Sequence, residues 1–202
     1  ARGWRIPFRR RRQFWWRRRL GELVMETLRR LLRHLWLDAD DARRALGEPA
    51  LDRLEARVRS SETDHTGQIC LCVEASLPPS YLWRHLARRE ALASVIRDRA
   101  ITLFGKQRVW DTEDNNGVLV YLLLAEHRIE IVADRALARQ LEPAAWQELV
   151  DRLATPCREA RFEDALAAAV DCLDQLLRAA FPGAGVTGLA SGGGLSDRPV
   201  LR

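Results

Sequence analysis

The residues best suited to chemistry lie in a short polar stretch that precedes an apolar run. This stretch carries three carboxylates and two amides and ends in glycine: Asp111, Glu113, Asp114, Asn115, Asn116 and Gly117. Asn-Asn-Gly tolerates the positive φ that a tight turn into a sheet often needs. Acidic and amide oxygens held at the mouth of a rigid strand either cap the loop or bind a cation. Calcium and magnesium are the cations that prefer such ligands.

Three segments of the chain predict β-strands. Residues 117–125 and 68–75 are almost continuously apolar, which is typical of strands buried on both faces. Residues 128–134 alternate and follow a two-residue turn, which predicts a third strand that returns antiparallel. Residues 81–104 are predicted to be largely helical, with a break near Arg88. They therefore connect the first two strands as a βαβ unit with parallel strands.

This topology brings the starts of the first two strands and the end of the third strand to one edge of the sheet. Clustered carboxylates repel each other unless a cation or a proton intervenes. We therefore predict a calcium or magnesium site there. The alternative is a set of solvated loop acids and helix caps. The polar residues collected at this edge are Glu62, Asp64, His65, Thr66, Asp111, Glu113, Asp114, Asn116 and Asp134, of which Glu62, Asp111, Asp114, Asn116 and Asp134 are the predicted metal ligands.

The remaining apolar periodicity predicts helices. Apolar residues recur at helical spacing from Leu28 to Trp36 with basic residues between them, which indicates a basic amphipathic helix. Such a helix either packs on the domain, which is the commoner arrangement, or lies on a membrane surface. Asp38 offers an N-cap for the next helix, and a further helix follows Pro49. Helices near residues 143–154 and 161–180 close the domain.

The basic character of the chain belongs to its first residues. The net charge is +5, but residues 1–19 contain nine arginines and no acid, so the remainder carries −4. Aromatic side chains lie among these arginines, and such a composition can bind nucleic acid or an anionic membrane. Alternatively, the arm is translated from a start assigned too far upstream, since Met25 is the only methionine. Nucleic acid is not a partner that we expect for the acidic domain.

Several classes of site are disfavoured by the sequence. The four cysteines form no CxxC pair, which disfavours a zinc or redox site. Residues 183–188 fit GxGxxG literally, but they follow a helix and open a flexible segment, so the dinucleotide interpretation fails. No Walker A motif and no evident nucleophile are present. No apolar run of 18 residues and no signal-peptide core occur, so we expect a cytoplasmic protein, with membrane contact limited to its surface.

Two segments carry a resemblance to a known family. Glu62 with residues 66–69, and residues 114–120 leading into the second strand, resemble the TPM domain family, and residues 128–134 and 162–166 fit it too. The family includes thylakoid-lumen proteins of photosystem II repair and many bacterial proteins, and the similarity covers about residues 50–182. It implies an α/β/α sandwich, a divalent-cation site in some members and a disputed phosphatase label. Glu62, Asp114 and Asp134 would be its acidic site residues.

We therefore expect one α/β domain, an α/β/α sandwich with a small mixed sheet, over residues 28–182. A basic arm would precede it over residues 1–27, and a Gly/Ser-rich disordered tail would follow over residues 183–202. The absence of a nucleophile favours a non-catalytic, cation-binding interaction module with a protein partner, acting in a membrane-associated complex. The alternative is a metal-dependent phosphatase-like hydrolase.

Overall fold

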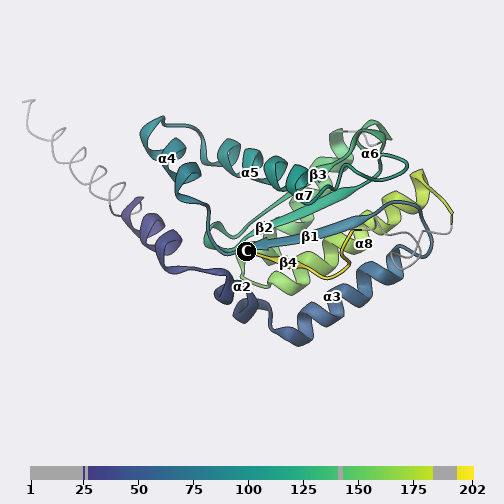
Figure 1. Cartoon of the computed structure of the whole chain (residues 1–202), viewed down its shortest axis with the longest axis horizontal. Coiled ribbons are helices and arrows are strands. Elements are labelled where there is room, and N and C mark those ends of the chain that lie inside the picture. Colours follow the sequence, from purple (N-terminus) through teal and green to yellow (C-terminus); the bar gives the residue numbers. More distant parts are fainter. Residues whose placement is uncertain (1–24, 26, 141–142, 184–194) are drawn as a thin grey trace, which may run out of the picture.

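The computed structural model describes residue 25 and residues 27–140, 143–183 and 195–202, so nearly all of the predicted arm lies outside the described residues. The described chain is an α/β/α sandwich with a small mixed sheet, as predicted, and the sheet has four strands, one more than expected (Figure 1). The strands are β1 (Ile69–Glu74), β2 (Val118–Leu123), β3 (Arg128–Ala133) and β4 (Val200–Leu201). The helices are α2 (Ala39–Leu46), α3 (Glu48–Ser61), α4 (Pro79–Ala87), α5 (Leu92–Lys106), α6 (Arg135–Gln140), α7 (Pro143–Arg158) and α8 (Phe162–Ala180), with a 3-10 turn η1 (Leu124–Glu126).

The sheet has the order β3-β2-β1-β4. β1 and β2 are parallel and in register from Ile69 opposite Val118, and β3 returns antiparallel to β2. Every residue of β1 and β2 is buried, because helices cover both faces. The continuous apolar runs in the sequence are therefore strands buried on both faces, as predicted.

Two separate cores lie on the two faces of the sheet. Alternate strand residues such as Leu71 and Val120 pack with α2, α3, α7 and α8, whose apolar stripes supply most of the larger core. The residues between them, such as Cys72 and Leu119, pack with α4 and α5. Successive side chains of each buried strand point to opposite faces of the sheet, so they pack alternately against the two helical layers.

Local sequence signals explain where several helices begin and end. The Asp38 carboxylate accepts hydrogen bonds from the backbone N–H groups of Asp40 and Asp41, in a capping box that starts α2. The predicted break near Arg88 is present, since α4 ends at Ala87 and α5 begins at Leu92. Arg89, at the break, has a φ of 55°, which an α-helix cannot accommodate.

The predicted disordered tail over residues 183–202 is wrong for its last part. β4 pairs in parallel with the outer edge of β1, and Arg202 N donates to Val73 O at 2.9 Å. Arg198 also binds the acidic residues of α3: Glu48 at 2.7 Å, Asp52 at 2.8 Å and Glu55 at 2.9 Å. A strand of two residues has no periodicity from which to be predicted, and its stability comes from distant partners.

Two further differences concern helices. α6 follows β3 directly and was not predicted, because six residues are too short to show an amphipathic pattern. α7 continues beyond the expected end at residue 154 to Arg158, with Pro156 inside it.

Among the described residues, no helix is both long enough and apolar enough to cross a bilayer.

Candidate functional site

The three loop segments that topology should bring together do meet at one end of the sheet. Asp134, just after β3, donates its backbone N–H to Gly117 O at 2.8 Å. Ala136 N donates to Asn115 O at 3.1 Å, so the ladder between β2 and β3 continues into the loops. The predicted acidic edge is therefore built from adjoining backbone segments, and its side chains must be placed one by one.

Thr66 connects the loop before β1 to the loop before β2. Its Oγ1 lies 2.8 Å from Asp114 Oδ2 and 3.0 Å from Asn116 Nδ2. A carboxylate can only accept, so the Thr66 hydroxyl proton points to Asp114 and the Asn116 amide donates to Thr66. The Asn116 carbonyl oxygen Oδ1 consequently faces away from Thr66. Three polar side chains from two loops are thus held in one hydrogen-bonded chain.

Two buried oxygens beside this chain have no partner among the described residues. Asn116 is fully buried and Asp134 is 7% exposed, and neither Asn116 Oδ1 nor Asp134 Oδ2 has a hydrogen-bond donor. The other Asp134 oxygen accepts from Arg135 N at 2.7 Å. Buried acceptors nearly always receive a hydrogen bond, so two unpaired acceptors on adjoining segments require an explanation. Amide and carboxylate oxygens are suitable ligands for Ca²⁺ or Mg²⁺, which would supply the missing partner.

The other two predicted ligands are not part of this group. Glu62, the C-cap residue directly after α3, is 8% exposed, and its Oε1 accepts from Ile69 N at 2.8 Å. Burial raises the pKa of the Glu62 carboxyl to about 7, although the Ile69 N–H opposes the shift. Asp111 is exposed, and its backbone N–H donates to Arg108 O at 2.8 Å. Within the described ranges, no three His, Cys, Asp or Glu side chains are placed to hold a metal ion, so a site would need amide or hydroxyl oxygens as well.

A second polar cluster, which sequence reasoning missed, joins α3 to α8. Ser61 Oγ lies 2.9 Å from both His65 Nε2 and Asp174 Oδ1. His65 is fully buried, and burial is the main reason why its pKa is lowered, against the attraction of Asp174. Ser61, the last residue of α3, and His65, after the helix, are close in sequence, but nothing there indicates that Asp174, far along the chain, would join them.

This cluster contains serine, histidine and aspartate but lacks the geometry of a nucleophilic triad. The Ser61 hydroxyl donates to Asp174, so Ser61 Oγ accepts from His65 Nε2–H and histidine cannot act as its base. Asp174 lies 3.6 Å from the same nitrogen, Nε2, and His65 Nδ1 has no partner within the described structure. A triad requires the carboxylate on the opposite nitrogen. Ser61 is also only 5% exposed, so the cluster fastens two helices together.

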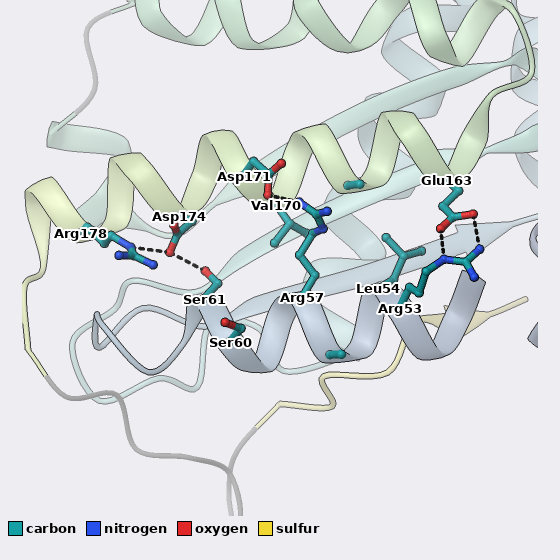
Figure 2. Close-up of a pocket in the computed structure, with 12 residues that line it drawn as sticks. Arg53, Leu54, Arg57, Ser60, Ser61, Glu163, Val170, Asp171, Asp174 and Arg178 are labelled. Atoms are coloured by element: carbon teal, nitrogen blue, oxygen red, sulfur yellow. Dashed lines mark hydrogen bonds and ion pairs between the residues drawn. The ribbon is translucent and has the colours of Figure 1, made fainter. Parts of the chain in front are cut away.

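A cavity of about 500 Å³ lies over this contact, between α3 and α8 (Figure 2). Its arginines point at carboxylates across the groove: Arg53 binds Glu163 at 2.6 and 2.8 Å, and Arg57 binds Asp171. Arg178 binds Asp174 at 2.8 Å. Each arginine in the cavity is therefore neutralised by an acid. The groove does not have the free positive charge that a phosphate ester would require.

Comparisons with known proteins agree with this architecture. The family model for the TPM domain matches residues 40–176, which is more than half of the chain. The NMR structure of BA42 protein from the psychrophilic bacterium Bizionia argentinensis is similar, with a TM-score of 0.57 and 18% sequence identity. The similarity covers 68% of this chain and 84% of that one. No curated protein matches. At this identity the BA42 structure supports the fold alone.

Proposed function

Because the chain belongs to the TPM domain family, we propose that it acts as a non-catalytic interaction module that binds a divalent cation. The cation is calcium or magnesium, and the partner is a protein of a cytoplasmic, membrane-associated complex. The proposed ligands are Asp114 and Asn116, from the loop before β2, and Asp134, which follows β3. Glu62 and Asp111 stay outside this ligand set.

The observation that carries the proposal is the pair of buried oxygens without donors, Asn116 Oδ1 and Asp134 Oδ2. Leaving a buried acceptor unpaired costs about 1–3 kcal/mol, a cost that a bound cation would offset. Thr66 supports the arrangement, because its hydrogen bonds hold Asp114 and orient the Asn116 carbonyl oxygen. The residue types also fit the ion, since oxygen ligands of mixed charge are those that calcium takes in proteins.

The test is a calcium and magnesium titration of the full chain after treatment with chelator, followed by calorimetry and by thermal unfolding. Binding should raise the free energy of unfolding by about 2.7 kcal/mol when the free ion is at 100 times its dissociation constant. Asp134→Asn keeps the shape of the side chain and removes its charge, so it should weaken binding at least about tenfold, or 1.4 kcal/mol.

Asp111→Asn is the matched control, because it removes a carboxylate from the loop before β2 and leaves the three proposed ligands in place. It should bind the ion as the wild-type protein does. If neither ion changes the melting temperature of the wild-type protein, there is no cation site. If Asp111→Asn and Asp134→Asn weaken binding equally, the ligand set is wrong and only the general charge of the edge matters.

The alternative function is a metal-dependent phosphatase-like hydrolase, in which a bound cation would orient phosphate and water. The Ser61 cluster and the cavity over it do not favour this reading, for the reasons of geometry and charge given above. Turnover of a generic phosphomonoester by the wild-type protein, abolished in Asp114→Asn while folding is retained, would favour the hydrolase.

A further inference from the structure

The helical segment over residues 27–36 is held to the domain by its polar side chains. His34 is buried: its Nδ1 accepts from Leu77 N at 3.1 Å, and its Nε2 lies 3.1 Å from Glu126 Oε1. Arg33 donates to Ala125 O at 2.7 Å. Because Nδ1 is an acceptor, Nε2 carries the proton and donates to Glu126. These contacts fix the rotation of the helical segment against the residues that follow β1 and β2.

The apolar stripe of the same segment consequently faces away from the domain. At 100° per residue, Leu28, Leu32 and Leu35 lie on the side of the helix opposite to residues 33 and 34. Their side chains are 46%, 45% and 71% exposed, and Trp36 beside them is 81% exposed. An amphipathic helix normally turns this stripe to the core. The sequence predicts packing on the domain, and packing does occur, but through the polar side.

Further apolar surface lies at the same end of the molecule. Figure 1 shows the helical segment and α4 together beyond the ends of β1 and β2. Trp83 of α4 is 67% exposed and Met25 is 50% exposed. Apolar side chains that are exposed together on one face, as the leucines of the helical segment are, indicate an interaction surface.

We propose that this leucine face, defined as Leu28, Leu32, Leu35 and Trp36, inserts into the surface of an anionic lipid bilayer. The charge of the chain favours lipid, because residues 1–19, which precede the face in the sequence, carry nine arginines, no acid, and three tryptophans. Arginine and tryptophan are the side chains that interfacial segments place at the headgroup level. Arg29, on the flank of the face, is exposed as well.

The docked side of the segment determines how it would lie in the bilayer. Arg33 and His34 hold that side to the domain, so only the leucine face is available to lipid and residues 27–36 do not span the bilayer. The segment would lie flat, with leucine side chains in the acyl region and the docked side toward the protein. The phosphates of a nucleic acid would pair with the arginines, but the leucine side chains would remain in water. A bilayer is therefore the better partner, because it would bury the leucines as well.

The test is co-sedimentation of the full chain with vesicles of phosphatidylcholine alone and with 30% phosphatidylglycerol, at low and high salt. The wild-type protein should bind the anionic vesicles, with an affinity that salt reduces. Leu32→Glu/Leu35→Glu should lower the partition coefficient at least about tenfold, because each leucine contributes several buried CH₂ groups. Both positions are exposed, so the variant should unfold as the wild type does.

Ile101→Glu is the matched control, since Ile101 is also 50% exposed but lies on α5. It should bind vesicles as the wild-type protein does. The proposal is overturned if the wild-type protein fails to sediment with anionic vesicles, or if the double variant binds them equally well. It is also overturned if the double variant converts a dimer to a monomer in the absence of lipid, because a second copy of the chain would then cover the leucine face.

Discussion

Arg99 of α5 and Glu74, the last residue of β1, form an ion pair inside the protein, with side chains 7% and 5% exposed. The guanidinium makes two hydrogen bonds to the carboxylate, one of them at 3.0 Å, and Tyr121 OH donates to Glu74 Oε2 at 2.7 Å. Arg99 also lies over the ring of Tyr81, 5.4 Å from its centroid. The pair therefore joins α5 to two strands in a region that is otherwise apolar.

Removing one member of this pair should be costly. Arg99→Met leaves the Glu74 carboxylate buried without its cation, and we expect a loss of about 3–5 kcal/mol in the free energy of unfolding. The measurement is urea unfolding at pH 7. Adding Glu74→Gln to Arg99→Met removes the unpaired buried charge and keeps an acceptor for Tyr121. The double variant should therefore regain part of the lost free energy of unfolding. Additive losses in the double variant would show that the ion pair itself contributes little.

The Glu62 carboxyl should make stability depend on pH. Its pKa is about 7 in the folded protein against 4.5 in the unfolded chain, so the folded state holds its proton more tightly. The contribution of this group is complete below pH 4.5 and is lost as the pH rises toward 7, by an amount on the order of 3 kcal/mol. Urea unfolding between pH 4 and pH 8 in chelator would measure this slope.

Glu62→Gln should remove this part of the pH dependence and retain the acceptor for Ile69 N. Glu113→Gln, an exposed carboxylate of the same edge, is the control. A wild-type slope unchanged in Glu62→Gln would mean that other groups cause it.

Gly117, at the turn into β2, should tolerate no side chain. A Cβ at this position would lie 2.0 Å from Val109 O, which belongs to the backbone and cannot simply move aside. Gly117→Ala should therefore reduce the free energy of unfolding by about 3 kcal/mol or more. Gly105→Ala is the matched control: a Cβ there meets open space, and alanine in a helix should add up to about 1 kcal/mol. Equal effects of the two substitutions would contradict the steric argument.

The hydrogen bonds of His34 should be needed to hold the helical segment over residues 27–36 against the domain. His34→Phe deprives Leu77 N of its acceptor and Glu126 of a donor, which we expect to cost about 1–3 kcal/mol. Faster hydrogen exchange at the Leu77 amide would report the undocking directly. Leu35→Ala on the exposed side should change stability by no more than about 0.5 kcal/mol. Slow exchange at Leu77 in His34→Phe would show that other contacts hold the segment.

The large features of the fold could be predicted because they depend on local patterns. β1 and β2 are continuous apolar runs, and the length between them requires a parallel crossover, so the meeting of their loops followed from topology. The side-chain pairings could not be predicted. Ser61 with Asp174, and Glu74 with Arg99, join positions far apart in sequence, and no periodicity connects them. At the acidic edge, the sequence predicted that the segments of Asp114, Asn116 and Asp134 would adjoin, but it could not show that the Glu62 carboxylate accepts from Ile69 N.

The position of β4 has a consequence for how the chain folds. β1 receives its neighbour β2 early, but its other edge remains open until residues 200–201 are available, after every other described element. An apolar strand with an open edge is a template for pairing with other chains, and slow closure prolongs that exposure. A chain shortened at residue 194 would keep most of its core, yet we expect it to aggregate during synthesis. Residues 200–201 therefore cover part of an edge of β1 that would otherwise be open to pairing with another chain.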